Sequence, residues 1–203
     1  MKRLIDIFLS LVALLISSPL WAIVPFLIKL EDGGPVFYAQ KRIGKNGKLF
    51  TIWKFRTMIP DAEKGLGPVQ SKVNDPRITR VGTFLRSTAL DELPQLLSIL
   101  WGDMSFVGPR ALRPGEKESS GDGTFREISE FPGGKERLTV IPGLTGLAQI
   151  YGSHDTPRKN KFRYDILYIK KKSLSLDLRL IVFSVFITLR GRWEYRGKKD
   201  GFM

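Results

Sequence analysis

The feature that most constrains this 203-residue chain is an uncharged run near its start. Residues 7–28 read IFLSLVALLISSPLWAIVPFLI, which is about the length that a helix needs to cross the hydrocarbon of a bilayer. A secretory signal peptide is the first alternative, since Lys2 and Arg3 precede the run. The length of the run and the tryptophan and prolines near its end are atypical of a cleavage site, so we expect membrane contact.

Pro19 predicts a bend in this helix, because proline lacks an amide donor and its ring collides with the carbonyl four residues earlier. Ser17 and Ser18 can bond the carbonyls that the bend frees. Basic residues lie on both sides of the run, so the positive-inside bias does not choose an orientation. A kinked transmembrane anchor and a bent helix that enters and leaves by one face both fit these residues.

The charge balance of the chain favours an anionic partner. Lysine and arginine number 33 against 20 aspartates and glutamates, which gives a formal net charge of +13. Nucleic acid, phosphorylated metabolites and acidic lipid headgroups all fit such a charge. The chain has no cysteine, which excludes disulfides, thiolate nucleophiles and cysteine-ligated metals.

The dipeptide Asn46-Gly47 lies between two β-rich runs, a pattern typical of a β-hairpin. If residues 49–58 form a strand, alternation places Lys54 and Arg56 on one face. The two cations would then lie roughly 6–7 Å apart and could clamp a phosphate. A solvated strand edge kept soluble by charge is the alternative interpretation.

An adjacent acid pair, Asp91 and Glu92, precedes a leucine-rich helix. Pro94 fits only the first turn of that helix, so we expect the helix to begin at or near Asp91 and to end at Gly102. There the partial positive charge of the helix terminus would hold both carboxylates ionised. The apolar face of the helix is predicted by four leucines spaced at i, i+3, i+4 and i+7, which are Leu93, Leu96, Leu97 and Leu100.

The acid pair has a purely structural interpretation and a chemical one. Carboxylates at a helix start commonly serve as caps and complement the helix dipole. The surrounding arginines, the membrane segment and the Gly108-Pro109-Arg110 turn favour a second role. Acids among cations can hold a divalent metal and attack a phosphate while the arginines neutralise its oxygens.

Two further segments carry expectations about packing. Residues 113–137 are polar, glycine-rich and mixed in charge, so we expect a surface insertion that does not interrupt the core. Residues 178–189 form an apolar run that is too short to span a bilayer. With its basic flanks the run suits an interfacial helix, and a buried core helix is the alternative.

Three motifs resemble the bacterial sugar transferase family, the monotopic phosphoglycosyl transferases that start glycoconjugate assembly on a polyprenyl phosphate. They are KFRTM at residues 54–58, DPRITRVGTFLRSTALDELPQLLSILWGDMSFVGPR at 75–110, and PGLTGLAQ at 142–149. The resemblance covers nearly the whole chain, from the hydrophobic helix to about residue 190. One departure is Ala111, where the family usually continues Gly-Pro-Arg with proline.

The resemblance implies a two-step reaction. Asp91 would attack the β-phosphate of a UDP-sugar and release UMP, and undecaprenyl phosphate would then take the sugar-phosphate from the enzyme. Glu92 would assist through proton handling or positioning, and Mg²⁺ would be bound with Asp91 as a ligand. The expected substrate-binding residues are Lys54, Arg56, Arg86, Pro109, Arg110 and Gln149.

The resemblance also implies an α+β fold in a small membrane-associated domain. We expect a re-entrant membrane helix over residues 1–32, broken at Ser18 and Pro19 with both ends cytoplasmic, and a catalytic domain over 33–203 with a β-hairpin and amphipathic interfacial helices. The chain would be the minimal form of the family, with no membrane-domain extension before the catalytic part. It would act at the cytoplasmic face of a bacterial inner membrane.

The expected partners are a UDP-sugar, undecaprenyl phosphate and bilayer lipid, with no nucleic acid. The residues leave open a homodimer, the identity of the sugar, the downstream pathway and the effect of Ala111 and residues 113–137 on the choice of donor. One alternative is a non-catalytic basic protein at the membrane periphery that binds acidic lipid or nucleic acid. Another is a membrane-bound phosphohydrolase, in which water would be the final acceptor.

Overall fold

The computed structural model describes residues 1–62, 75–119, 125–127, 130–152, 158–191 and 193. Two helices at the N-terminus, α1 (Lys2–Ile16) and α2 (Leu20–Asp32), are bent by 59° at the break between them. The predicted bend is confirmed, with Pro19 immediately before α2. The Ser17 hydroxyl donates to Leu14 O at 3.4 Å, so this serine satisfies a carbonyl that the break frees.

The bent pair is the candidate for membrane contact. No single helix of the described residues is long and apolar enough to cross a bilayer, whereas α1 and α2 together have the required length and composition. The outward side of the pair carries large exposed apolar side chains: Leu4, Phe8, Leu11, Leu15, Ile16, Ile23, Phe26 and Leu30.

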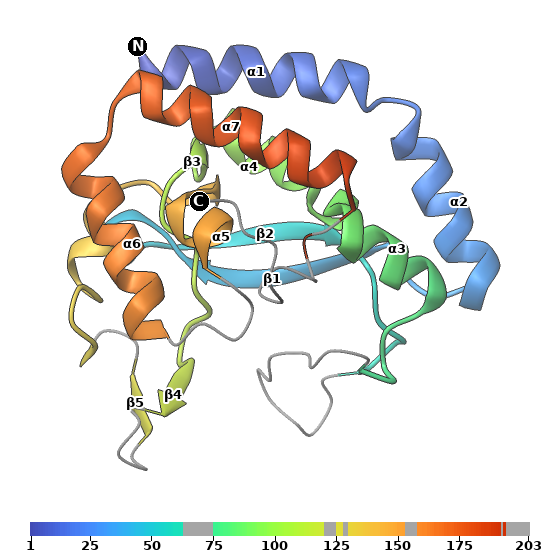
Figure 1. Ribbon diagram of the computed structural model, residues 1–203. Helices are drawn as coiled ribbons and strands as arrows, with labels where there is room; N and C mark the ends of the chain where they lie inside the picture. Colours follow the sequence, from blue (N-terminus) through green and yellow to red (C-terminus); the bar gives the residue numbers. More distant parts are fainter. Residues whose placement is uncertain (63–74, 120–124, 128–129, 153–157, 192, 194–203) are drawn as a thin grey trace.

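A two-stranded antiparallel hairpin follows the bent pair (Figure 1). Strand β1 (Phe37–Ile43) pairs with β2 (Leu49–Phe55) across a short 3₁₀ turn, η1 (Lys45–Gly47). Asn46 has φ 55° and Gly47 has φ 79°, the left-handed conformations that an Asn-Gly turn favours. The predicted hairpin is therefore confirmed, although its second strand ends at Phe55 and not at residue 58.

The acid pair lies in a tight turn between two helices. Helix α3 (Arg80–Thr88) ends at Ala89, whose φ of 55° starts the 3₁₀ turn η2 (Leu90–Glu92). Helix α4 (Gln95–Trp101) then begins after Pro94 and ends at Gly102, as predicted. The α-helix does not begin near Asp91 as expected, because the residues before Pro94 close a 3₁₀ turn with i→i−3 bonds, such as Leu93 N to Leu90 O at 3.2 Å.

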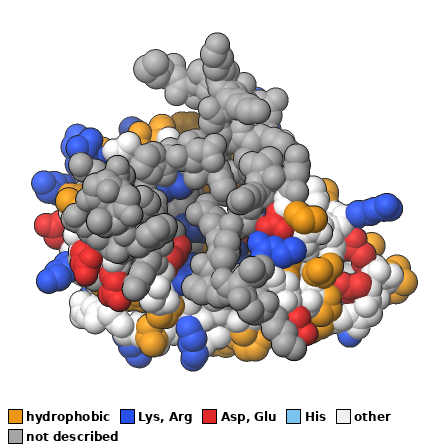
Figure 2. Space-filling view, turned by 90° about the horizontal axis from the view of Figure 1, so that it is seen from below, with side chains coloured by type: hydrophobic (Ala, Val, Ile, Leu, Met, Phe, Trp, Pro, Cys, Tyr) orange, Lys and Arg blue, Asp and Glu red, His pale blue; other side chains and the backbone are white. Residues whose placement is uncertain are grey.

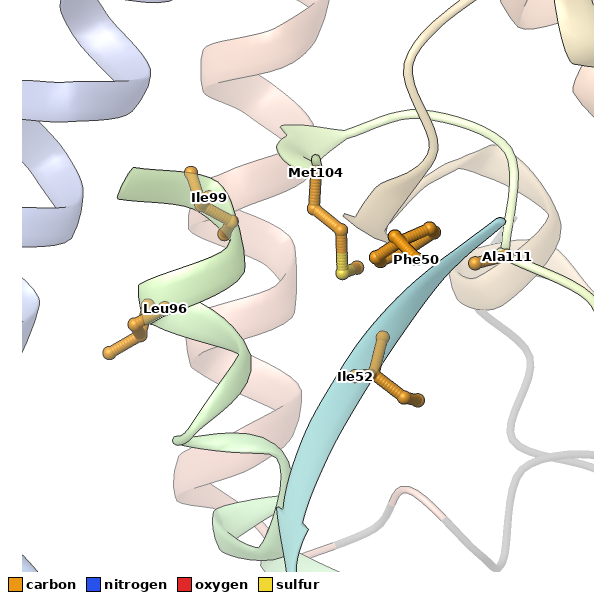
Figure 3. Close-up of a cluster of buried hydrophobic side chains, with 6 residues drawn as sticks. All are labelled: Phe50, Ile52, Leu96, Ile99, Met104 and Ala111. Atoms are coloured by element: carbon orange, nitrogen blue, oxygen red, sulfur yellow. The ribbon is translucent and has the colours of Figure 1, made fainter. Parts of the chain in front are cut away.

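The N-terminal helices share their core with the rest of the molecule. Figure 3 shows one buried cluster, in which side chains of β2 and α4 meet those of the following loop: Phe50, Ile52, Leu96, Ile99, Met104 and Ala111. Ala13 and Leu14 of α1 pack against this cluster. A second cluster joins Val24 and Ile28 of α2 to Phe55 and Leu85. Segment 1–32 therefore contributes to the interior as well as to the surface.

The remaining elements complete a mixed fold of helices and three two-stranded sheets among the described residues. Strand β3 pairs in parallel with β6, and β4 pairs antiparallel with β5. The bounds are β3 (Ser105–Val107), β4 (Lys117–Ser119), β5 (Phe125–Glu127), η4 (Glu136–Thr139), β6 (Gly143–Thr145), α5 (Leu147–Tyr151), α6 (Arg158–Lys171) and α7 (Leu174–Leu189).

Residues 113–137 do contribute to the core, which corrects the expectation of a purely surface insertion. Phe131 is buried with Leu112 and Phe162, and its ring meets that of Phe162 edge-on at 6.3 Å between centroids. Arg137 is buried on Asp165. The composition of the segment did not predict the burial of Phe131 and Arg137, because the residues that they contact lie elsewhere in the sequence.

Helix α7 contains the apolar run 178–189 and exposes most of it. Leu180 is buried, whereas Val182, Phe183, Val185, Phe186 and Leu189 are exposed. In Figure 1, α7 and α1 run along the same side of the molecule, and Lys2 Nζ ties their first turns by an ion pair with Asp177 Oδ2 at 2.6 Å. Figure 2 shows the molecule from below, where described side chains of both charges lie among apolar ones.

Candidate active site

The two carboxylates of the acid pair are held by one lysine of the hairpin. Lys54 Nζ lies 2.5 Å from Glu92 Oε1 and 3.4 Å from Asp91 Oδ2. Asp91 is only 7% exposed as a residue. The leucines on either side of the pair, Leu90 and Leu93, pack against the cluster that α2 forms with the hairpin. Strand β2 thus supplies the cation, and apolar packing fixes the turn that carries the acids.

The pKa values of the two carboxyl groups are shifted in opposite directions, upward for Asp91 and downward for Glu92. Burial raises the pKa of Asp91 above its ordinary value, and the neighbouring Lys54 only partly opposes this effect. Burial also acts on Glu92, but Lys54 and Arg110 outweigh it and lower the pKa of that carboxyl to about 2. The helix terminus that was expected to hold both carboxylates ionised does not lie at the acid pair, because helix α4 begins four residues after Asp91.

Two of the expected arginines lie around the pair. Arg110 Nη2 is 3.3 Å from Glu92 Oε1, and half of the Arg110 side chain is exposed. Arg86 lies on α3, where its Nε donates to Thr57 Oγ1 at 2.9 Å and its charge acts on Asp91. The acid pair therefore has a lysine and an arginine in contact and a second arginine at longer range, an arrangement that can receive an anionic group.

Arg56 is not brought to the acid pair. Its side chain is 7% exposed, and its guanidinium donates to Asp32 Oδ2 at 2.7 Å and to Met58 O at 2.8 Å. Because β2 ends at Phe55, the alternation that would align Arg56 with Lys54 stops one residue early. The predicted clamp of these two cations is not formed, and Arg56 joins the hairpin to the end of α2.

Pro109 and Gln149 shape the turn that carries Arg110. Pro109 O accepts from Gly143 N at 2.9 Å. A side chain at Gly143 would place its Cβ 2.0 Å from Gly108 N, so only glycine allows this close approach. Gln149 Nε2 lies 3.5 Å from both Gly108 O and Gly143 O. The PGLTGLAQ motif therefore packs its backbone directly on the Gly-Pro-Arg turn.

Arg137 is a site-supporting residue that the sequence interpretation missed. Its Nη2 donates to Arg110 O at 2.6 Å and lies 2.9 Å from Asp165 Oδ2. Its guanidinium also lies 4.6 Å from the centroid of the Phe162 ring. The sequence held no local signal for these contacts, since Asp165 is 28 residues away.

A shallow hollow opens beside Glu92 and Arg110. Arg42 and Gln95 also line it, and neither was predicted as a site residue. The hairpin register could have indicated Arg42, because it pairs with the core residue Phe50 and so shares its face. The other lining residues are Ile52, Lys54, Met104, Ala111, Gly143 and Leu144.

The donor set of the site suits a magnesium ion that arrives with a phosphorylated substrate. The described residues include no group of three or more acidic or histidine side chains that could enclose a metal. Mg²⁺ commonly binds through one or two carboxylates together with substrate phosphates and water. The adjacent Asp91 and Glu92 match that requirement and do not match a site built by protein ligands alone.

Comparison with known proteins confirms the resemblance found in the motifs. A family model described as "Bacterial sugar transferase" matches residues 1–191. The exopolysaccharide production protein PSS of Rhizobium leguminosarum bv. phaseoli is 43% identical over 95% of this chain and 97% of its own length. The UDP-glucose:undecaprenyl-phosphate glucose-1-phosphate transferase of Klebsiella pneumoniae is 42% identical over 91% of this chain. The undecaprenyl-phosphate galactose phosphotransferase of Salmonella typhimurium is 35% identical over 96% of this chain.

The relatives differ in length. This chain spans 39% of the Klebsiella transferase and 42% of the Salmonella protein, whereas it spans nearly all of the Rhizobium protein. The matched region contains the acid pair, Lys54 and the three motifs.

Proposed function

The chain belongs to the bacterial sugar transferase family, and we propose that it transfers a sugar-1-phosphate from a UDP-sugar to undecaprenyl phosphate. The observation that carries this proposal is the buried acid pair held by Lys54 and Arg110. The names of the relatives from Klebsiella and Salmonella support the same acceptor. Nucleic acid is not an expected partner.

In the first step, an Asp91 carboxylate oxygen attacks the β-phosphorus of the UDP-sugar. The bond from that phosphorus to the bridging oxygen breaks, and UMP leaves with the bonding electrons. An aspartyl-phosphosugar remains on the enzyme. In the second step a phosphate oxygen of undecaprenyl phosphate attacks the same phosphorus, releases the Asp91 carboxylate and forms the lipid-linked diphosphosugar.

The cations of the site lower the barrier to the first step. A carboxylate and a phosphate charge repel by about 4 kcal/mol per unit pair at 4 Å for an effective dielectric constant near 20. Lys54 and Arg110 stand where they can offset this repulsion, and Arg86 adds a longer-range charge. Glu92 holds Lys54 and Arg110 in place through its two ion pairs. Magnesium, held by Asp91 when bound, would supply further neutralisation of the diphosphate charge.

The apolar exterior of α1, α2 and α7 supports a location at a bilayer. We propose that α1 and α2 enter and leave the cytoplasmic leaflet of the inner membrane as one re-entrant element, with α7 at the interface. The second substrate carries its phosphate at headgroup level, and Leu90 and Leu93 beside the acid pair pack in the cluster formed with α2. An acid pair close to the lipid surface can reach that phosphate without extracting the lipid tail.

A non-catalytic basic protein at the membrane periphery would explain the net charge but not the site. Two adjacent buried carboxylates are costly in free energy, and they weaken attraction to acidic lipid. Perturbed carboxyl pKa values beside a hollow are typical of a reaction centre.

The test incubates purified protein in lipid nanodiscs with a panel of UDP-sugars and Mg²⁺ while UMP is measured. With the right donor and no acceptor, we expect one UMP per protein and a phosphosugar adduct on Asp91 by mass spectrometry. Adding undecaprenyl phosphate should restart UMP release, and Asp91→Asn should abolish it. No UMP with any donor would refute the transferase, and sugar phosphate released into water would indicate a phosphohydrolase. Turnover by Asp91→Asn without an adduct would refute the covalent step alone.

A further inference from the structure

Arg42 carries a buried guanidinium that its surroundings compensate only in part. The residue is 9% exposed, its Nη1 donates to Ala111 O at 2.9 Å and its Nη2 donates to Gln40 Oε1. Its Nε has no hydrogen-bond partner, and no carboxylate of the described residues forms an ion pair with it. Burial and the charges of Arg110 and Arg113 lower the pKa of Arg42 to about 10.

Gln95 presents a second unmet donor beside the same hollow. The residue is 4% exposed, and its Nε2 has no hydrogen-bond partner. A buried donor without an acceptor costs free energy. Gln95 and Arg42 both line the hollow next to Glu92, so the two unmet donors belong to side chains that border the same space.

The charge in the hollow indicates what kind of acceptor fits. Three of its lining side chains are cations, Arg42, Lys54 and Arg110, and one is a carboxylate, Glu92. The net charge of these lining side chains is positive, and the hydrogen-bond donors without partners are those of the Arg42 guanidinium and the Gln95 amide. Oxygens that carry negative charge complement such a set, and tetrahedral phosphate offers several of them at once.

We propose that Arg42 and Gln95, together with Arg110, form a phosphate subsite beside the acid pair. The choice of phosphate rests on the proposed function, in which both the departing nucleotide and the accepting lipid bring a phosphate next to Asp91. Donors that are already fixed and shielded from water stabilise an incoming oxyanion with little reorganisation. Arg42 and Gln95 are therefore assigned to binding a phosphate that flanks the transferred group.

The experiment measures equilibrium binding of three ligands to the full chain in nanodiscs: UMP, uridine and undecaprenyl phosphate. Gln95→Met keeps the length of the side chain and removes its donor, and Arg42→Lys keeps the charge and removes the guanidinium. We expect the phosphate ligand of this subsite to bind roughly ten- to a hundredfold more weakly to each variant. Lys41→Met is the matched control, since Lys41 is an exposed cation next to Arg42 on β1.

The pattern of loss identifies the phosphate. Weaker UMP binding with unchanged uridine binding would place the nucleotide phosphate in the subsite, and weaker binding of undecaprenyl phosphate alone would place the lipid phosphate there. If Gln95→Met and Arg42→Lys bind all three ligands as tightly as Lys41→Met, the subsite is refuted, even if wild-type protein transfers sugar-phosphate. If the ligands bind in the expected pattern but no donor yields UMP, the proposed function fails and the subsite stands.

Discussion

Replacing Arg137 by methionine tests whether the buried ion pair under the Arg110 turn is essential to the fold. Arg137 and Asp165 have side chains that are each 3% exposed. Removal of one partner from such a pair typically costs about 3–5 kcal/mol, because the other charge is left uncompensated. For a chain of this size each kcal/mol lowers the melting temperature by about 2–4 °C, so we expect a decrease of roughly 6–20 °C.

The pH dependence of this loss has a defined sign. Burial already raises the pKa of Asp165, and Arg137 is the group that opposes the rise. Without Arg137 the folded protein should keep a proton on Asp165 that the unfolded chain releases. The folded pKa then exceeds the unfolded pKa, so stability falls as the pH rises between the two values. The deficit of Arg137→Met should therefore be larger at pH 8 than at pH 5.

Thermal unfolding in nanodiscs, followed by circular dichroism, measures the effect. Arg163→Met on the exposed side of α6 is the control and should change stability by less than about 0.5 kcal/mol. The double variant Arg137→Met/Asp165→Leu should recover part of the loss, because it leaves no unpaired charge. A melting temperature of Arg137→Met equal to that of Arg163→Met, or a double variant no more stable than the single one, would refute the reasoning.

Three further perturbations test other contacts. Gly82→Ala should lower the free energy of unfolding by about 1–3 kcal/mol and displace α3, since the new Cβ would lie 2.1 Å from Thr57 O. Chemical denaturation measures this loss, with Thr83→Ala on the exposed side of α3 as the control. Equal denaturation midpoints for the two variants would contradict the prediction. Glu31→Ala should cost about 1 kcal/mol, because the Glu31 carboxylate accepts from the first two amides of α3; unchanged amide exchange across α3 would contradict it. Chelation by EDTA should stop UMP release and added Mg²⁺ should restore it, whereas release that persists in EDTA would argue against a metal.

The features that the sequence predicted correctly are those fixed by local chemistry. Pro19 marks the helix break, Asn46-Gly47 marks the hairpin turn, and Gly102 ends α4 with φ 99°. Each of these residues restricts its own backbone, so its neighbours in the sequence suffice to interpret it. The acid pair was recognised through its motif, and the structure adds its contact with Lys54.

The features that the sequence could not predict depend on distant partners. Arg56 bonds to Asp32, 24 residues away, and not to a group near Lys54. In the sequence Arg137 is one charge in a polar segment, whereas in the structure it contacts Asp165 and Phe162 of α6. The raised pKa of Asp91 likewise depends on burial by packed elements, which a helix-terminus argument from residues 91–102 does not contain.

The contribution of α1 to the interior has a consequence for engineering the N-terminus. Arg3 Nη2 donates to Leu100 O at 2.6 Å at the end of α4, while Leu14 packs on the cluster that contains Leu96. An unrelated hydrophobic helix grafted in place of residues 1–32 could supply the proposed attachment to lipid, but it would leave the end of α4 without the Arg3 contact and would remove side chains that pack in the interior. We therefore expect such chimeras to lose the geometry of the acid pair even where the proposed lipid attachment is kept.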